Sequence, residues 1–175
     1  EYLGGDDPVF AGPYVHVGMD EYGAANADVF RAYGEVLRGI VRRYGKKPCM
    51  WGANEHPAKA PGQVLVDIWN WAPKGYDPLV MIENGYDTLC THDKFLYIVP
   101  AAGYYHDYLD LDFLFDKWEP TMFSSRQATT RDNPRLFGGK FAVWNDISCN
   151  GITEDDTLDR VFPALQVLAQ KMWSG

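Results

Sequence analysis

Residues 14–22 read Tyr14-Val15-His16-Val17-Gly18-Met19-Asp20-Glu21-Tyr22. This stretch opens as an apolar run of strand character, meets a glycine and then presents two adjacent carboxylates, after which a helical pattern begins. In α/β barrels, strands that end in acidic residues just before a βα loop place catalytic groups at the C-terminal rim. Asp20 and Glu21 are therefore the first candidates for chemistry, although most such acid pairs are solvated loop residues.

Helical and strand-like segments alternate after this stretch. Residues 26–44 carry apolar side chains at 3.6-residue spacing, with Asn26 as the candidate N-cap and Gly45 as the C′ residue. Short apolar runs predict the later strands: 48–51, 64–69 (interrupted by Asp67), 141–144, and one of 86–90 and 96–99. Further helices are expected at 78–84, 109–118 and within 158–173, and loops at 55–62 and 124–135. Pro163 either begins the last helix or kinks a longer one.

This alternation predicts an α/β fold, in which crossover helices join the strands of a parallel sheet. We count about five βα units, whereas a complete (β/α)₈ barrel needs eight and typically about 250 residues. The 175 residues are therefore expected to form the C-terminal portion of a (β/α)₈ TIM barrel.

Composition narrows the classes of partner. A net charge of −8 and a pI of about 4.9 argue against nucleic acid and anionic membranes. No apolar run approaches the roughly 20 residues that span a bilayer. Three widely spaced cysteines predict neither a zinc site nor a disulfide framework, and we expect buried thiols, although two of them could pair. The loop-like start without an initiator Met suggests a mature product or an excised piece.

Aromatic or acidic residues end four of the five expected strands: Asp20 with Glu21, Trp51, Trp69, and Trp144 with Asp146. A single tryptophan at a strand end usually packs in the core, but three beside carboxylates suggest an apolar box with a polar rim, which suits a pyranose ring. Paired carboxylates in such a box suggest glycoside hydrolysis. Because neighbouring residues that leave a strand point to different sides, adjacent acids fit best if one protonates the leaving oxygen and the other holds a substrate group that attacks C1.

The run from His16 to Glu21 resembles the His-x-Gly-x-Asp-Glu signature of family 20 glycoside hydrolases, the β-N-acetylhexosaminidases. The resemblance continues in order through 50–52, 66–69, 96–100, 138–146, 160–165 and 171–173. Within the family, Tyr97-Ile98-Val99-Pro100, Gly103-Tyr104-Tyr105 and Trp144-Asn145-Asp146 look more like the lacto-N-biosidase-type branch than the lysosomal hexosaminidases.

The resemblance implies retaining, substrate-assisted hydrolysis of terminal β-linked N-acetylhexosamine, or of lacto-N-biose-type units, without cofactor or metal. Asp20 would orient the 2-acetamido group, and Glu21 would be the general acid and then the base. The other implied roles are in substrate binding: Trp51, Trp69 and Trp144 as pocket walls, Tyr97 on the acetamido oxygen, and Asp146 on sugar hydroxyls. His16 either supports the acid pair without contacting the substrate or is a core histidine whose ring nitrogens are hydrogen-bonded.

The resemblance also implies that residues 1–175 span strand 4 to helix 8 of the barrel, without the N-terminal half and its sugar-binding arginine. The chain alone is then expected to be inactive and to self-associate or to need that half. By resemblance, the enzyme would be secreted or at the cell surface. Two other classes stay open: a non-catalytic carbohydrate-binding or interaction domain, and a retaining glycosidase with its own nucleophile.

Overall fold

The computed structural model describes residues 2–5, 8–22, 24–52, 63–70, 77–123, 126–127 and 129–174. Two compact units make up the chain: Glu1–Asp67 with Ala72–Thr88, and Ile68–Trp71 with Leu89–Gly175. The expected loop at 55–62 lies outside the described residues, as do residues 124, 125 and 128 of the expected loop at 124–135.

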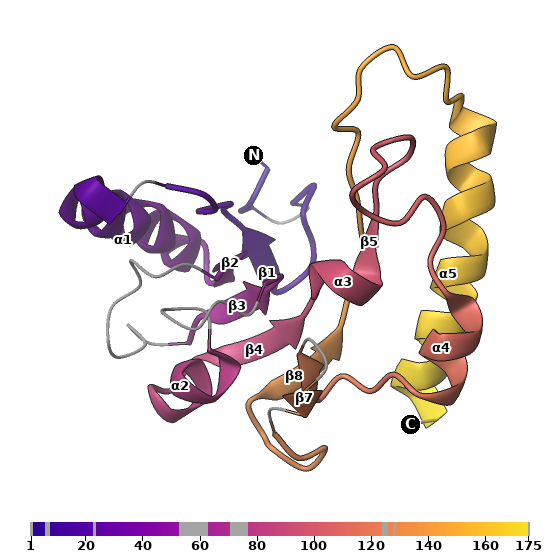
Figure 1. Ribbon diagram of the computed structural model, residues 1–175. Helices are drawn as coiled ribbons and strands as arrows, with labels where there is room; N and C mark the ends of the chain where they lie inside the picture. The colour runs from indigo at the N-terminus through magenta and orange to yellow at the C-terminus, as the bar shows by residue number, and fades with distance from the viewer. Residues whose placement is uncertain are drawn as a thin grey trace. The chain divides into compact units, whose positions relative to one another are not determined.

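Parallel strands form the centre of the first unit (Figure 1). Strand β1 (Tyr14–His16) pairs with β2 (Lys47–Trp51), which pairs with β3 (Leu65–Ile68). Helix α1 (Ala27–Arg43) connects β1 to β2 and packs against β2. This β1–α1–β2 crossover confirms the α/β class that the alternating pattern predicted.

Helix α1 lies within one residue of its predicted bounds, and Asn26 is its N-cap residue as predicted, but its start differs in detail. The Asn26 side chain makes no capping hydrogen bond, and the helix is instead entered through a 3₁₀ turn, η1 (Ala24–Asn26). Its buried positions are Phe30, Gly34, Arg38 and Val41. The rest of the apolar face is open, because Val29, Tyr33 and Val36 are each 59% exposed.

The first unit continues through helix α2 (Pro78–Glu83) into the beginning of β4 (Asp87–Cys90). Asp77 caps α2, because its side chain accepts a hydrogen bond from the Leu79 amide at 2.9 Å. Tyr86, between α2 and β4, is only 1% exposed.

Burial raises the pKa of Tyr86 to about 12, against a weaker opposing effect of Arg38. The folded protein therefore keeps the Tyr86 hydroxyl protonated at pH values where the unfolded chain, with an ordinary pKa near 10, has lost the proton. The unfolding free energy should consequently fall as the pH rises from about 10 to 12, by about 2–3 kcal/mol in total. Urea unfolding of the wild type and Tyr86→Phe across this range should show the extra loss only in the wild type. Tyr33→Phe, at an exposed tyrosine, should behave as the wild type.

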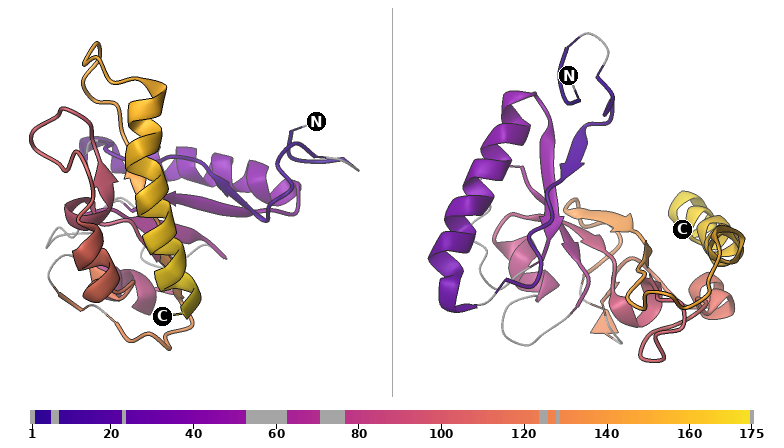
Figure 2. Two further views of the ribbon diagram at one scale, coloured as in Figure 1. Left: turned by 90° about the vertical axis from the view of Figure 1, so that its right-hand side faces the viewer. Right: turned by 90° about the horizontal axis from the view of Figure 1, so that it is seen from above.

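The second unit contains short strands and the longest helix. Strand β5 (Tyr97–Ile98) pairs in parallel with β9 (Ala142–Val143), and the end of β4 lies beside β8 (Leu136–Gly139). Strands β6 (Met122–Phe123) and β7 (Arg126–Gln127) form an antiparallel pair. Helix α3 (Asp93–Leu96) precedes β5, while α4 (Leu111–Asp116) and α5 (Glu154–Ser174) pack together (Figure 2).

Several sequence predictions need correction in the second unit. Both 86–90 and 96–99 contain a strand, β4 and β5, rather than only one of them. The expected final strand at 141–144 is reduced to β9, and β8 precedes it, because the chain pairs first with β4 through β8 and then with β5 through β9. Strand β7 lies within a segment that was expected to be a loop.

Helix α5 begins earlier than its apolar pattern indicated. The Thr153 hydroxyl accepts from the Asp156 amide at 3.2 Å, and the Asp156 carboxylate accepts from the Thr153 amide at 2.9 Å. These reciprocal bonds form a capping box, so the helix starts at Glu154 and runs through Pro163. Of the two roles considered for Pro163, the start of a helix is wrong.

Two further expectations concerned the state of the cysteines and the presence of membrane-spanning segments. Cys49 and Cys90 are buried as expected, whereas Cys149 is exposed, and no disulfide joins the cysteines of the described chain. Among the helices that the structure describes, none combines the length and apolarity needed to cross a membrane.

Gly139 in β8 is expected to tolerate no side chain. A Cβ there would overlap Cη2 of Trp118, whose side chain is fully buried, and would lie 3.4 Å from the Cys90 carbonyl oxygen. Gly139→Ala should therefore destabilise the protein by about 1–3 kcal/mol through overpacking. Gly39→Ala is the control, because nothing lies within 4 Å of its Cβ and alanine favours a helix. Equal unfolding free energies for Gly139→Ala and the wild type would show that the Trp118 site can relax.

Candidate active site

The turn after β1 carries the acid pair. Its backbone is unusual, because Gly18, Met19 and Glu21 all have positive φ angles, of 75°, 77° and 50°. Asp20 and Glu21 are exposed, whereas Met19 is buried at 8% exposure. A Cβ on Gly34 of α1 would lie 3.0 Å from Cε of Met19, so the absence of a side chain at Gly34 makes room for that contact. The buried Met19 side chain packs the turn against α1, while both carboxylates lie at the surface of the unit.

Two further predicted residues lie against this turn. Strand β2 ends at Trp51, whose backbone amide donates to the Gly18 carbonyl at 2.9 Å. The His16 ring contacts the Trp51 ring edge-on, with 5.0 Å between the ring centroids. His16 is hydrogen-bonded at both ring nitrogens, yet it is not a core residue, because 30% of its side chain is exposed.

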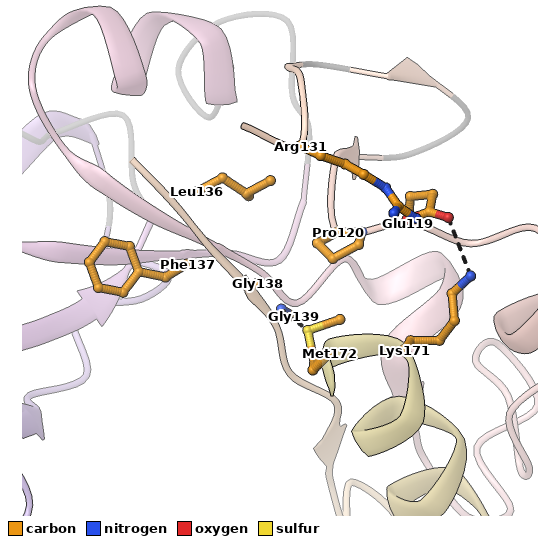
Figure 3. A pocket seen from close by; sticks show the side chains of 9 residues that line it. All are labelled: Glu119, Pro120, Arg131, Leu136, Phe137, Gly138, Gly139, Lys171 and Met172. Carbon is orange, nitrogen blue, oxygen red and sulfur yellow. Dashed lines mark hydrogen bonds and ion pairs between the residues drawn. The ribbon is translucent and has the colours of Figure 1, made fainter. Parts of the chain in front are cut away.

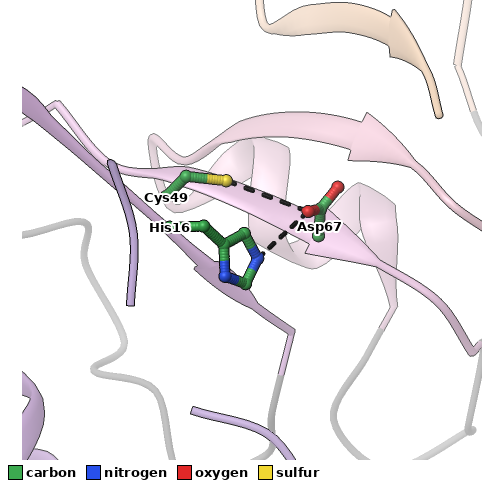
Figure 4. Close-up of side chains that lie close together, drawn as sticks. All are labelled: His16, Cys49 and Asp67. Carbon is green, nitrogen blue, oxygen red and sulfur yellow. Dashed lines mark hydrogen bonds and ion pairs between the residues drawn. The ribbon is translucent and has the colours of Figure 1, made fainter. Parts of the chain in front are cut away.

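His16, Cys49 and Asp67 also form a group whose ligating atoms all lie within 4.8 Å of one another (Figure 4). Histidine, cysteine and aspartate are ligand types that Zn²⁺ accepts. However, Nε2 of His16 and Oδ2 of Asp67 already contact each other at 3.1 Å, while Sγ of Cys49 lies 3.9 Å from the same oxygen. These contacts account for the group without an ion.

In the second unit, aromatic rings gather around Tyr97 at the start of β5. Trp69 stacks nearly parallel to it, with ring centroids 6.4 Å apart, and Trp144 meets it at 61° and 5.7 Å. Tyr105 completes the set at 5.4 Å. Trp144 is held there because it follows β9, and its amide donates to the Ile98 carbonyl at 2.9 Å. The structure therefore brings three of the four predicted aromatic residues together within one unit, and Trp51 belongs to the other.

Asp146 lies beside a tyrosine that the sequence reasoning gave no role. The Tyr104 hydroxyl donates to Oδ2 of Asp146 at 3.0 Å, and this hydrogen bond raises the pKa of Tyr104. The neighbouring Tyr105 hydroxyl donates to Oδ2 of Asp93 at 3.1 Å. Both tyrosines were part of the family resemblance, and a pair of hydroxylated aromatic residues directly after Gly103 was the signal that could have marked them.

A salt bridge holds the loop that carries these tyrosines. Arg160 of α5 donates to both carboxylate oxygens of Asp107, at 3.1 and 3.2 Å, and its guanidinium lies 4.4 Å from the centre of the Tyr108 ring. The hydrogen bonds to Asp107 raise the pKa of Arg160. The loop is thus tied to the longest helix of its unit.

A cavity of about 310 Å³ lies elsewhere in the second unit, between β8 and the end of α5 (Figure 3). Glu119, Arg131 and Lys171 form its charged side, and both cations bind Glu119. Burial alone would raise the pKa of Glu119, but the hydrogen bonds and charges of Arg131 and Lys171 outweigh it and lower that pKa. None of the predicted site residues lines this cavity.

Comparison with known families shows which family the chain belongs to. The family model "Glycosyl hydrolase family 20, catalytic domain" matches residues 13–175. This chain belongs to glycosyl hydrolase family 20. The family resemblance inferred from the motifs is thereby confirmed.

Several known proteins resemble the chain in sequence or in structure. Lacto-N-biosidase from Bifidobacterium bifidum is 23% identical over 194 residues, which cover 96% of this chain but 17% of that protein. A family 20 β-N-acetylglucosaminidase matches with a TM-score of 0.65 at 22% identity, covering 94% of this chain and 35% of the other. A mutant Streptomyces plicatus β-hexosaminidase, solved in complex with its product GlcNAc, matches with a TM-score of 0.63 at 20% identity, covering 93% and 33%.

The family 20 chain thus spans about a sixth to a third of the length of these relatives, and the structural matches establish the shared α/β fold. Its candidate site residues form two groups. The first unit holds His16, Asp20, Glu21 and Trp51, and the second holds Trp69, Tyr97, Trp144 and Asp146.

Proposed function

We propose that this chain is part of a retaining glycosidase that removes terminal β-linked N-acetylhexosamine, or a lacto-N-biose-type unit, from glycans. The observation that carries the proposal is the exposed Asp20–Glu21 pair on an anchored turn at the end of β1, in a chain that belongs to family 20. The relatives support the substrate class, because they include a lacto-N-biosidase and a β-hexosaminidase bound to GlcNAc.

Adjacent carboxylates suit a reaction in which the substrate supplies its own nucleophile. Glu21 would protonate the glycosidic oxygen while the acetamido carbonyl oxygen attacks C1, so that the bond to the leaving group breaks and a cyclic oxazolinium forms. Asp20 would stabilise the positive charge that develops on the acetamido nitrogen. Glu21 would then take a proton from the water that attacks C1, which reopens the ring and restores the acid.

The remaining candidates would bind the sugar. Trp69 and Trp144 are half-buried and cluster with Tyr97, so the C–H faces of a pyranose would stack on the exposed parts of the two indoles, and Trp51 would contribute a further wall. Tyr97 would also donate to the acetamido oxygen. Asp146, with its oxygen already oriented by Tyr104, would accept hydrogen bonds from sugar hydroxyls. A buried Tyr97 at 6% exposure is well held for such a role.

We propose that residues 1–175 correspond to strand 4 through helix 8 of a (β/α)₈ barrel, with about five βα units. Two features of the first unit support preceding units beside it. Strand β1 is at the edge of the strand order among the described residues, and the apolar side chains of Val29, Tyr33 and Val36 on α1 are exposed. The chain alone would then be inactive and prone to self-associate, because open strand edges and apolar surface favour association.

The test of the function is turnover of aryl glycosides by the complete enzyme. We expect chromophore release from an aryl N-acetyl-β-glucosaminide or an aryl lacto-N-bioside, and none from the matching β-glucoside that lacks the acetamido group. Comparable release from the plain glucoside would favour a retaining glycosidase with its own nucleophile. Sugar binding by a folded protein without turnover of any of these substrates would favour a carbohydrate-binding domain and contradict the proposal.

A further inference from the structure

Asp67 is the one charged residue in β3, a strand whose four positions are all buried. A carboxylate in such a place needs a partner that compensates for its lost hydration. The register supplies one: His16 pairs with Cys49, and Cys49 pairs with Leu65, two residues before Asp67. Because side chains alternate along strands, these residues of three neighbouring strands point to the same side of the sheet.

The geometry of this group defines the state of the His16 ring. The Gly18 amide donates to Nδ1 at 3.1 Å, so Nδ1 carries a lone pair and the ring proton is assigned to Nε2. Nε2 then donates to Oδ2 of Asp67, 3.1 Å away, and Asp67 is fully buried (Figure 4). The buried carboxylate thus holds the imidazole in one tautomer and one orientation.

The same ring supports the turn that carries the acid pair. Gly18, whose amide the ring holds, is the first of the positive-φ residues that lead to Asp20 and Glu21. Its carbonyl accepts from the Trp51 amide at 2.9 Å, and the His16 ring packs on the edge of Trp51. Positive φ is unfavourable for Met19 and Glu21, so this backbone shape persists only where surrounding contacts impose it.

We propose that Asp67 and His16 form a positioning pair, in which the buried carboxylate fixes the imidazole and the imidazole holds the turn that carries Asp20 and Glu21. The catalytic consequence rests on the proposed function, whereas the effect on the turn does not. Neither residue needs to touch the sugar. Their contribution would be to keep the two carboxylates and Trp51 in register with each other.

Hydrogen–deuterium exchange of the complete protein tests the pair directly. His16→Phe keeps a ring against Trp51 but removes both ring nitrogens, and Asp67→Asn keeps the shape but removes the charge. Both should speed exchange of the amides of residues 17–22, by about 10-fold or more for His16→Phe, while exchange over residues 47–50 of β2, before Trp51, stays as in the wild type. Cys49→Ala is the matched control, because the Cys49 side chain contacts the same oxygen of Asp67, whereas its backbone carbonyl, which accepts from the Val17 amide, is kept in alanine.

Kinetics provide the second readout. With the aryl glycoside, His16→Phe should lower kcat by about 10- to 100-fold, the cost of a loosely placed catalytic group, and leave KM within about threefold. The double variant with Asp67→Asn should lose little more than His16→Phe alone, because the two residues act as a unit. Full activity in Cys49→Ala is expected.

Three results would overturn the pair: unchanged exchange of 17–22 in His16→Phe, equal acceleration in Cys49→Ala, or stoichiometric Zn²⁺ binding by the wild type that Cys49→Ala abolishes. The last would assign a metal site to this group instead. A wild type that turns over no acetamido glycoside would contradict the proposed function, and the exchange experiment would still decide on the pair.

Discussion

Glu21→Gln is expected to lower kcat on acetamido glycosides by about 10²–10⁴-fold, the usual contribution of general acid–base catalysis. Glutamine has the shape of glutamate, but its amide can neither deliver a proton to the leaving oxygen nor accept one from water. Glu21 is exposed on a turn whose anchors are Met19 and Gly18, so the substitution should leave the backbone unchanged. Steady-state kinetics with an unactivated leaving group measure the loss in kcat. Calorimetry measures whether the variant still binds the product.

Two comparisons sharpen the Glu21 experiment. The loss in kcat should be smaller with a dinitrophenyl leaving group, because this group departs without protonation. The acid role of Glu21 is then not needed, whereas its role as the base still is. Glu83→Gln, at an exposed glutamate of α2, should retain full activity as the charge-matched control. If kcat of Glu21→Gln stayed within a few-fold of the wild type, another residue would have to be the acid.

The fold class was predictable because the helices and longer strands of this chain have clear patterns of apolar residues in the sequence. The 3.6-residue period over 26–44 and the apolar runs of β2 and β3 are each easily distinguished from the sequence of the neighbouring loops. Strands of two residues, such as β5, β7 and β9, carry no readable period, so their pairing could not be inferred. The start of α5 was missed for another reason: the capping box at Thr153 and Asp156 lies one turn before the apolar stripe begins.

The candidate site was predictable where residues follow strands and unpredictable where loops supply partners. Tryptophans and acids at strand ends could be read directly, and Trp69, Tyr97 and Trp144 do lie together. The hydrogen bond between Tyr104 and Asp146 depends on how a loop folds back across 42 sequence positions, which no local pattern encodes. Asp67 was visible as an interruption in an apolar run, but its partner His16 became clear only from the strand register.

Asp20→Asn is expected to separate substrate assistance from ordinary nucleophilic catalysis. In the proposed reaction, positive charge develops on the acetamido nitrogen as the oxazolinium forms, and the Asp20 carboxylate faces that charge mainly in the transition state. Replacing it with a neutral amide of the same size should lower kcat by about 10²–10³-fold, the range seen when one preorganised electrostatic partner is removed. Binding of the ground-state sugar should change much less.

A thiazoline mimic of the cyclised intermediate provides the decisive measurement, because it carries the ring that Asp20 is proposed to stabilise. Its affinity for Asp20→Asn should fall by a factor similar to the loss in kcat, since transition-state-like ligands report transition-state contacts. Asp159→Asn, at an exposed aspartate of α5, is the control for the loss of one negative charge and should bind the mimic as the wild type does. Unchanged thiazoline affinity in Asp20→Asn, with kcat reduced, would mean that Asp20 acts on something other than the acetamido group. A retaining enzyme of that kind should also hydrolyse glycosides that lack the acetamido group.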